Sequence, residues 1–281
     1  MLLGAHMSIA KGPHLAITRG ESAGCEAIQI FVKSNRRWSA KPMAQKKIDK
    51  FIETRKTHDI NPIFAHNTYL VNLASPDEET LQKSIDCFLY EIKTSEQLGL
   101  EYIVMHPGSH VGTGEEKAIQ QIAANIRNLL LKTENQKIRI LIETVAGQGT
   151  NIGYKFQQIN DILGLINIPE RTGVCLDTCH IFAAGYDFRT EKAYENMIDE
   201  ANSLFGVDQI YAIHLNDSKG ELGSKLDRHK HIGKGKIGLD GFKNFVLDKR
   251  FENIPGVLET PKSKDMSMDK VNLSILRSLM E

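Results

Sequence analysis

Histidines and acidic residues recur at the ends of short apolar segments along this 281-residue chain. The segments are typical of β-strands, and six of them carry such a residue at or beside the last position: His66, His106, Glu143, Asp177, His214 and Glu259. Zinc takes imidazole nitrogen and carboxylate oxygen in sets of three or four. A single such residue is more often only hydrogen-bonded, or caps a helix. Six together predict a metal centre, provided that the strand ends meet.

Two short motifs add three more candidate ligands. His180 lies in "DTCH", and Asp227 and His229 lie in "DRH"; we expect both motifs to be loops that reach the same cleft. Nine ligands would serve two or three metal ions. Divalent ions about 3.5–4 Å apart, bridged by a carboxylate, hold the attacking and leaving oxygens of a phosphoryl displacement. The sequence therefore predicts hydrolysis at phosphorus, with Glu143 as the catalytic, bridging carboxylate.

The apolar segments and the sequences between them predict the elements that position these residues. Eight strands are expected, at 2–6, 27–32, 62–66, 102–106, 138–143, 172–177, 209–215 and 255–259. The clearest helix has apolar residues at helical spacing from Leu81 to Leu98, with Ser75 as N-cap, Pro76 as first helical residue and Glu78 completing a capping box. A second has its apolar stripe between 119 and 130. Further helices are expected near 12–23, 42–58, 155–166, 191–205, 240–249 and 266–280.

Eight strand–helix units in a chain of this length predict an α/β fold, a (β/α)8 TIM barrel that forms a single domain over residues 1–281. A doubly wound open sheet is the alternative. Such a sheet typically carries G-x-G-x-x-G after its first strand, whereas this chain has "GAHMSIAKG". In a barrel the carboxyl ends of all strands converge on one face, so the candidate ligands would meet there. His6 also ends a strand, but we expect it nearer another seam of the barrel, where it would only orient a ligand.

Composition limits the cell compartment and the partners. The four cysteines show no paired spacing, which favours free thiols and a reducing compartment, and the chain has no long apolar segment, so we expect a cytoplasmic protein without membrane contact. The formal net charge is zero, which by itself argues against nucleic acid. Bound metals change this argument. Three zinc ions carry six positive charges, two more than Glu143, Asp177, Asp227 and Glu259 neutralise.

Several long motifs resemble those of the endonuclease IV family, the zinc-dependent apurinic/apyrimidinic endonucleases of base excision repair. They are "AHNTYLVNLAS" (65–75), "HPGSH" (106–110), "GVCLDTCH" (173–180), "HLNDSK" (214–219) and "GSKLDRHKHIGKGKIG" (223–238). The resemblance implies a (β/α)8 barrel whose three zinc ions cleave the phosphodiester 5′ to an abasic site in double-stranded DNA. The products would be a 3′-hydroxyl and a 5′-deoxyribose phosphate.

Carried onto this chain, the resemblance implies three zinc sites. His66, His106 and Glu143 would hold one ion, and Glu143 would bridge to a second held by Asp177, His214 and Glu259. The third would lie between His180, Asp227 and His229. Manganese at one site is a further possibility. Asn67, which follows His66, leaves the ligand set intact.

The resemblance also implies how DNA would bind. Arg36 in "KSNRRW" and Tyr69 with Leu70 in "HNTYL" would enter the minor groove and help to extrude the abasic nucleotide, which is the cheapest nucleotide to unstack. Basic residues of the 214–238 segment would contact phosphates: Lys219, Lys225, Arg228, Lys230, Lys234 and Lys236. We expect a monomer.

Two other functions fit parts of this pattern. A metal-dependent sugar isomerase or epimerase on the same barrel would use one or two ions and leaves Asp227, His229 and Tyr69–Leu70 without a role. A DNA-lesion binder with structural metals would need closed sites, which are usually rich in cysteine. Cys179 is expected to be a packed thiol, and His110 and His231 to support ligands or face phosphates.

Overall fold

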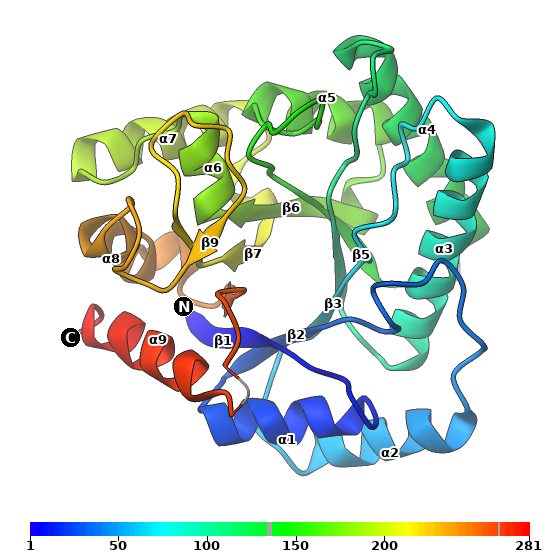
Figure 1. Cartoon of the computed structure of the whole chain (residues 1–281), viewed down its shortest axis with the longest axis horizontal. Helices are drawn as coiled ribbons and strands as arrows, with labels where there is room; N and C mark the ends of the chain where they lie inside the picture. Colours follow the sequence, from blue (N-terminus) through cyan, green and yellow to red (C-terminus); the bar gives the residue numbers. More distant parts are fainter. Residues whose placement is uncertain (134–136, 264) are drawn as a thin grey trace.

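The computed structural model describes residues 1–133, 137–263 and 265–281 and contains a closed barrel of eight parallel strands (Figure 1). The strands follow the order β1-β10-β7-β6-β5-β4-β3-β2 around the barrel. Their bounds are β1 Leu2–Met7, β2 Ala27–Ile30, β3 Ile63–His66, β4 Tyr102–Met105, β5 Arg139–Glu143, β6 Thr172–Asp177, β7 Ile210–His214 and β10 Pro255–Leu258. All eight predicted strands are confirmed, and barrel closure excludes the open sheet.

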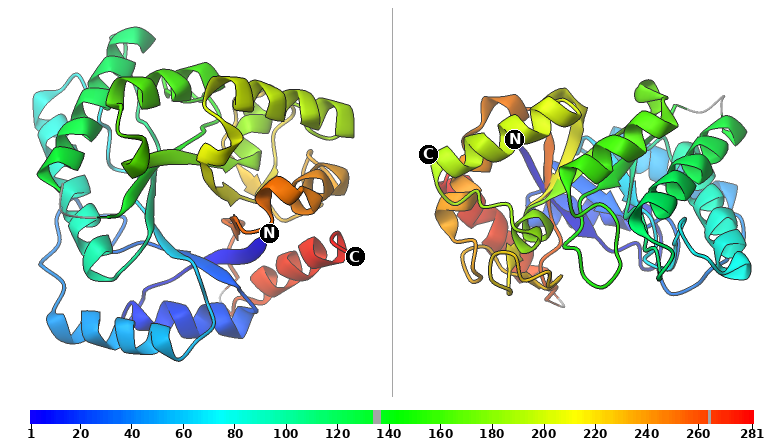
Figure 2. Two further views of the ribbon diagram at one scale, coloured as in Figure 1. Left: turned by 180° about the vertical axis from the view of Figure 1, so that it is seen from behind. Right: turned by 90° about the horizontal axis from the view of Figure 1, so that it is seen from above.

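Helices surround the barrel, as both views in Figure 2 show. Their bounds are α1 His14–Ala23, α2 Gln45–Lys56, α3 Glu78–Gln97, α4 Glu115–Lys132, α5 Phe156–Ile166, α6 Thr178–Ala184, α7 Glu191–Leu204, α8 Leu239–Leu247 and α9 Ser267–Ser278. Single turns of 3₁₀ helix, η1 Pro169–Arg171, η2 Val207–Gln209 and η3 Lys249–Phe251, precede or follow strands. Across the described ranges, we find no helix with both the length and the apolar character needed to cross a bilayer.

One predicted helix cap was wrong, and one helix was missed. Asp77, not Ser75, is the N-cap of α3, since its carboxylate accepts a hydrogen bond from the Thr80 backbone N–H at 2.8 Å. Ser75 instead accepts from the backbone of Asp77 just outside the helix. The short helix α6 was not predicted, because seven residues directly after a strand have no room for a helical apolar pattern. Asp177 caps α6 through the backbone N–H of His180.

Alternation along each strand separates the barrel interior from the layer beneath the helices. Residues such as Ile63 and Ala65 belong to the large core between sheet and helices. A second, smaller cluster fills the interior of the barrel: Phe64, Val104, Leu141, Cys175, Ala212 and Val257. Side chains two positions further along each strand point to the same face. The interior cluster is therefore the floor on which the next layer of side chains lies.

The segment between β7 and α8 is ordered by a small antiparallel pair, β8 Asp217–Ser218 and β9 His229–Lys230. In the right-hand view of Figure 2 this gold segment projects from the same edge as other loops that follow strands. The buried carboxylate of Asp217 accepts hydrogen bonds from the backbone N–H groups of Ser218, Gly235 and Ile237 at 2.8, 2.8 and 3.1 Å. One acid thus fixes both ends of the segment.

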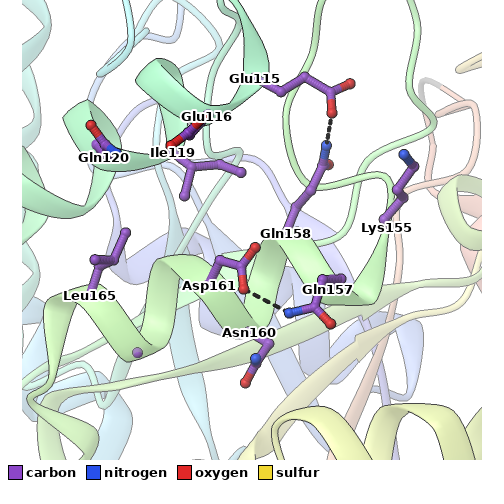
Figure 3. Close-up of a pocket in the computed structure, with 11 residues that line it drawn as sticks. Glu115, Glu116, Ile119, Gln120, Lys155, Gln157, Gln158, Asn160, Asp161 and Leu165 are labelled. Atoms are coloured by element: carbon purple, nitrogen blue, oxygen red, sulfur yellow. Dashed lines mark hydrogen bonds between the residues drawn. The ribbon is translucent and has the colours of Figure 1, made fainter.

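A cavity of about 680 Å³ lies on the outside, between α4 and α5 (Figure 3). Its polar side chains largely satisfy one another. Gln158 donates to Glu115 at 3.0 Å, and Gln157 donates to Asp161 at 2.7 Å. The groove is therefore a solvated junction between two helices, in contrast to the barrel mouth.

Candidate metal centre

The candidate ligands lie one layer above the apolar floor of the barrel. Six of them stand two positions after a floor residue, for example His66 after Phe64 and Glu143 after Leu141. The barrel register places Asp177 and His214 directly opposite each other on β6 and β7. His106 and Glu259 each follow the last residue of their strand. The structure thus brings together the six residues selected from the strand ends.

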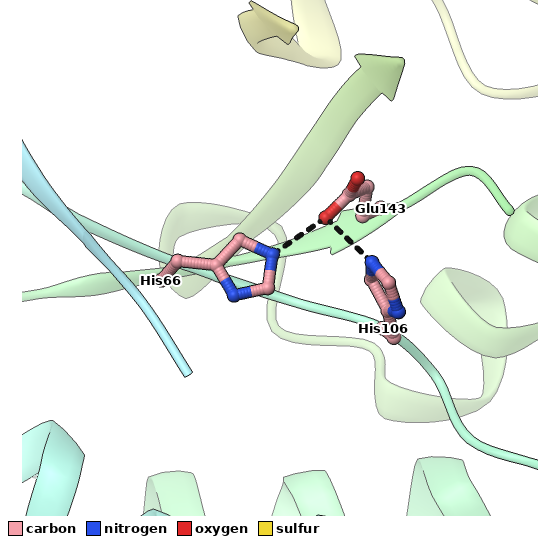
Figure 4. A group of neighbouring side chains, drawn as sticks. All are labelled: His66, His106 and Glu143. Atoms are coloured by element: carbon pink, nitrogen blue, oxygen red, sulfur yellow. Dashed lines mark hydrogen bonds and ion pairs between the residues drawn. The ribbon is translucent and has the colours of Figure 1, made fainter. Parts of the chain in front are cut away.

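Glu143 is the centre of the cluster and is fully buried. Its Oε2 lies 2.8 Å from Nε2 of His66 and 3.2 Å from Nε2 of His106 (Figure 4). Its Oε1 lies 3.1 Å from Nδ1 of His214 and 3.3 Å from Nδ1 of His180. A carboxylate whose two oxygens face different sets of imidazoles has the geometry of a bridge between two cation sites.

The second group lies on the opposite side of Glu143. Nδ1 of His214 is 3.3 Å from Oε2 of Glu259 and 3.7 Å from Oδ2 of Asp177. Ligand atoms of Glu143, Asp177, His214 and Glu259 all lie within 4.8 Å of one another. Three carboxylates around one imidazole form a compact anionic site, which a cation would stabilise.

The third group contains the residues from the two short motifs. Nε2 of His180 lies 3.3 Å from Oδ1 of Asp227, and Nε2 of His229 lies 3.5 Å from the same oxygen. Neither histidine belongs to a loop, contrary to our expectation: His180 lies in α6 and His229 in β9. Asp227 lies between β8 and β9 and is the most exposed of the three.

Hydrogen bonds to main-chain carbonyls define which nitrogen of two imidazoles carries the proton. Nδ1 of His66 donates to the Asn67 carbonyl at 2.6 Å, and Nδ1 of His180 donates to the Thr144 carbonyl at 2.8 Å. A carbonyl oxygen can only accept, so the hydrogen is on Nδ1. In the neutral rings, Nε2 therefore presents a lone pair. In both cases that lone pair points at a carboxylate oxygen, which is also an acceptor.

Two further imidazoles, the buried His214 and the half-buried His229, follow the same rule. Gln29 donates its amide N–H to Glu259 at 2.6 Å, so its amide oxygen accepts from Nε2 of His214 at 2.8 Å. Nδ1 of His229 donates to the Glu259 carbonyl at 3.2 Å. The remaining nitrogen of each ring again faces carboxylates. Nε2 of His229 is buried, and in the described part of the chain no group hydrogen-bonds to it.

These opposed acceptors fit zinc. Ligands about 2.0–2.1 Å from a tetrahedral zinc ion lie about 3.3 Å from one another. Most separations within the cluster lie between 2.8 Å, from His66 to Glu143, and 3.7 Å, from His229 to Asp177. Nitrogen and oxygen lone pairs at such distances repel unless a cation lies between them. The donor set and its spacing therefore fit a metal centre.

The pKa values of residues in the cluster also favour the binding of cations. Burial would raise the pKa of Glu143, but His106 and His214 outweigh it and hold the pKa well below its usual range. Burial would lower the pKa of His180, but Asp177, Asp227 and Glu143 outweigh it and raise the pKa well above the usual value. Carboxylates stay ionised, and imidazoles hold a cation tightly, whether that cation is a proton or a metal ion.

Comparisons with known proteins place the chain in a family. Residues 17–278 match the family described as Xylose isomerase-like TIM barrel. The "Probable endonuclease 4" of Chloroflexus aurantiacus is 44% identical over 278 residues, which is 99% of this chain and 98% of that protein. The crystal structure of endonuclease IV from Thermus thermophilus superposes with a TM-score of 0.88 at 31% identity, covering 100% of this chain and 99% of that one.

The chain belongs to the endonuclease IV family of enzymes. The fold is shared more widely. A "D-tagatose 3-epimerase-like protein" superposes with a TM-score of 0.75 at 17% identity, covering 100% of this chain and 98% of that one. At that identity the match shows the barrel alone. The family assignment confirms the resemblance seen in the sequence motifs.

In this endonuclease IV family member, sequence reasoning missed side chains that hold the ligands. Gln29 bonds to both His214 and Glu259 from inside β2. Asn216 donates to Asp177 at 2.7 Å and accepts from the Glu259 backbone N–H at 2.7 Å. A signal for Gln29 was present: it is the polar residue inside the apolar segment "AIQIFV". His6, expected at another seam, lies only 3.5 Å from Glu259 and can help to orient it.

Other residues of the sequence analysis have clear positions. Cys179 is a buried thiol, as expected, and its Sγ approaches the Arg228 carbonyl at 3.7 Å. Burial raises its pKa to about 12, so it remains protonated. His110 caps a turn by accepting from the Gly112 backbone, and His231 accepts from Asn272 of α9. Both support loops at the mouth of the barrel.

Of the predicted DNA-contact residues, Tyr69 lies beside two of the candidate metal ligands. Tyr69 is 60% exposed, and its ring lies 5.6 Å from that of His66 and 5.9 Å from that of His106. Arg36 is exposed and Leu70 is half-buried. Lys219, Arg228, Lys230 and Lys234 are exposed on the 215–238 segment. Lys225 and Lys236 are exposed as well, but Lys225 lies over the Tyr154 ring at 5.1 Å and Lys236 pairs with Glu221 at 2.6 Å.

The cluster opens to solvent through a cavity of about 350 Å³. Its walls are Tyr69, His106, His180, Asp227, His229 and Glu259. Most of these side chains are polar and belong to the candidate metal groups, and Tyr69 forms part of the rim. A volume of this size lies within the range of sites that admit a small ligand or a single extruded group.

Proposed function

We propose that this protein hydrolyses the phosphodiester bond 5′ to an abasic site in double-stranded DNA, leaving a 3′-hydroxyl and a 5′-deoxyribose phosphate. The observation that carries the proposal is the set of imidazole lone pairs that face carboxylate oxygens around Glu143. Cations held in one cavity would stabilise such a set. Membership of the endonuclease IV family supplies the reaction class.

Three zinc ions suit the three groups of ligands. His66, His106 and Glu143 would hold one, and Glu143 with Asp177, His214 and Glu259 a second. His180, Asp227 and His229 would hold the third. Held in this way, zinc supplies activation of water for attack on phosphorus and stabilisation of the leaving oxygen. Manganese at one of the three sites remains compatible with the nitrogen and oxygen donors.

The protein's own side chains contribute orientation and shape. Carbonyls of Asn67 and Thr144 hold His66 and His180 with Nε2 directed inward, so the ligands need no rearrangement. Gln29 instead accepts from Nε2 of His214 and leaves Nδ1 directed at the carboxylates. Glu143, shared between two groups, fixes their separation. The cavity rim then restricts entry to a backbone segment that can leave the duplex.

The loops around the cavity would recognise the lesion through deformation of the duplex. Tyr69 and Leu70 would insert as an apolar wedge, and Arg36 would enter beside them. A nucleotide that already lacks its base costs the least to extrude. Exposed lysines of the 215–238 segment would contact phosphates and fix register without reading sequence.

The test is incision of a duplex that contains one tetrahydrofuran abasic analogue, which cannot undergo β-elimination, so that a nick reports hydrolysis. We expect a 5′-side nick whose 3′ end a polymerase extends, with an identical intact duplex left uncut. Glu143→Ala should lose at least about 100-fold in rate, the scale of lost metal activation. Glu195→Ala, on the outer surface of α7, is the matched control and should keep full activity. Full activity in Glu143→Ala would remove the proposed bridge.

Elemental analysis distinguishes this function from a sugar isomerase or epimerase. We expect three zinc ions per chain, and loss of more than one in Glu143→Ala because the carboxylate is shared. One or two ions, with no incision of the abasic duplex, would favour the isomerase. Tight binding of abasic DNA without incision by the fully metallated protein would favour a lesion-binding role.

A further inference from the structure

A buried ion pair lies beneath the two loops that carry Arg36 and Tyr69. Nζ of Lys33, which follows β2, is 3.3 Å from Oε1 of Glu91 in the middle of α3. The two side chains are only 2% and 1% exposed. Neither belongs to the metal cluster, and neither reaches the cavity above it.

Lys33 ties down the loop that contains Arg36. Its ammonium group donates to the Arg37 carbonyl at 2.6 Å and to the Ser34 carbonyl at 3.4 Å. These two carbonyls lie on either side of Arg36. The backbone around Arg36 is therefore folded over a single buried positive charge.

Glu91 ties down the loop that contains Tyr69 and Leu70. Both of its oxygens accept from the Thr68 backbone N–H at 3.3 Å, directly before Tyr69. The Thr68 hydroxyl also accepts from Lys33 at 3.4 Å, so the two loops share one network. Because α3 is a long helix packed on the barrel, Glu91 offers both loops a rigid reference point.

A contribution to folding stability does not by itself explain the buried ion pair of Lys33 and Glu91. Desolvation offsets much of the attraction within a buried ion pair, and an apolar pair of similar size is often as stable. Burial raises the pKa of Glu91 even though Lys33 opposes the shift, so desolvation outweighs pairing for the carboxylate. What an apolar pair would lack is the directional bonds to Arg37, Ser34 and Thr68.

We propose that Lys33 and Glu91 are positioning residues that set the spacing between the Arg36 loop and the Tyr69–Leu70 loop, and thereby the discrimination of abasic from intact duplex. The discrimination rests on the proposed function; the spacing of the loops does not. Wedge residues act only if they enter the groove together, so loosening either loop should weaken recognition before it affects the metal cluster.

The test uses the double variant Lys33→Met/Glu91→Leu, because a single substitution would leave a buried charge unpaired and could unfold the protein. Trp38, the single tryptophan of the chain, follows the Arg36 loop and packs against the core, so its emission reports on that loop directly. We expect a red-shifted emission and about twofold more quenching by acrylamide, as for a locally opened segment. Zinc content should be unchanged. The matched control is Lys83→Met/Glu79→Leu, an exposed pair on the same helix, which should leave the emission unaltered.

The second measurement compares binding of abasic and intact duplexes. We expect the preference for the abasic duplex to fall about tenfold in the double variant, the scale of re-ordering loops on binding. KM should rise more than kcat falls. Unchanged Trp38 emission would overturn the positioning role, and an unchanged preference would overturn its link to recognition. Absence of any abasic preference in the wild type would instead count against the proposed function, and the Trp38 measurement would still decide on the loops.

Discussion

Two acid-rich clusters of this protein differ in what faces their carboxylates. On the outer surface, Asp248 accepts from the Tyr194 hydroxyl at 2.7 Å and from Nε of Arg250 at 2.9 Å, and Arg250 also donates to Glu195 at 2.8 Å. Every acid there faces a donor. At the barrel mouth, Glu143 faces Nε2 of His66, which carries no proton in the neutral ring because Nδ1 donates to the Asn67 carbonyl. Both clusters contain carboxylates, but only at the mouth do they converge on imidazoles in groups that could hold metal ions.

The comparison shows how a structural network differs from a binding centre. In the outer network, donors and acceptors are matched, so the side chains are complete without a ligand. At the mouth, one buried nitrogen of His229 has no hydrogen-bond partner in the described part of the chain, and carboxylates converge from several strands. Buried mismatches of this kind are destabilising unless a ligand resolves them. Perturbing each cluster separately should therefore give different results.

The largest expected effect follows removal of the metal ions. Chelation should abolish incision and lower the free energy of unfolding, since an ion held at 100 times its Kd stabilises the native state by about 2.7 kcal/mol. Calorimetry with and without chelator measures the change, and added zinc should reverse it. The outer network should not respond, so Asp248→Asn should show the same chelator effect as the wild type. Undiminished incision by metal-free protein would contradict the comparison.

A smaller effect, a loss of zinc affinity, is expected for Gln29→Leu. The substitution keeps the approximate size but removes the acceptor for His214 and the donor to Glu259. Loss of such an orienting partner typically costs about 10–100-fold in metal affinity. Competition with a fluorescent zinc chelator measures it. Gln82→Leu, which removes an exposed bond to Asp86 on α3, is the control. Equal zinc affinity in both variants would show that Gln29 contributes only packing and does not orient the ligands.

The smallest effect concerns pH and the outer network. Burial would raise the pKa of Asp248, but Arg250 and Tyr194 outweigh it and hold the pKa below its usual value. The folded state therefore prefers the ionised acid. Its contribution, less than about 1 kcal/mol, is present above the unfolded pKa of about 3.9 and is lost as pH falls through the folded value. Urea unfolding of wild type and Asp248→Asn should give free energies that differ at pH 6, and the difference should shrink as pH falls below about 3.9. A difference in the free energy of unfolding that increased in acid would contradict a lowered pKa for Asp248.

Several residues of the candidate metal centre could be predicted from the sequence because the residue types within each short segment determine its local structure. Apolar segments ending in His66, Glu143 or Asp177 have few alternatives to buried strands with a polar end. The cap of α3 was less accessible, because Ser75 and Asp77 both suit an N-cap and only the path of the chain selects Asp77. The helix containing His180 is too short for any periodic signal. Gln29 is an isolated polar residue in its segment of the sequence, and only the closed barrel brings it to His214 and Glu259.

The sequence by itself determined which residue types were available and on which face of each strand they lie, because alternation is a property of the backbone. The tertiary structure decided which of them meet. Closure and register of the barrel set Asp177 beside His214, and the Thr144 carbonyl, which follows β5, sets the tautomer of His180. Distances between side chains more than 100 residues apart depend on how the whole barrel packs, so no local pattern could contain them.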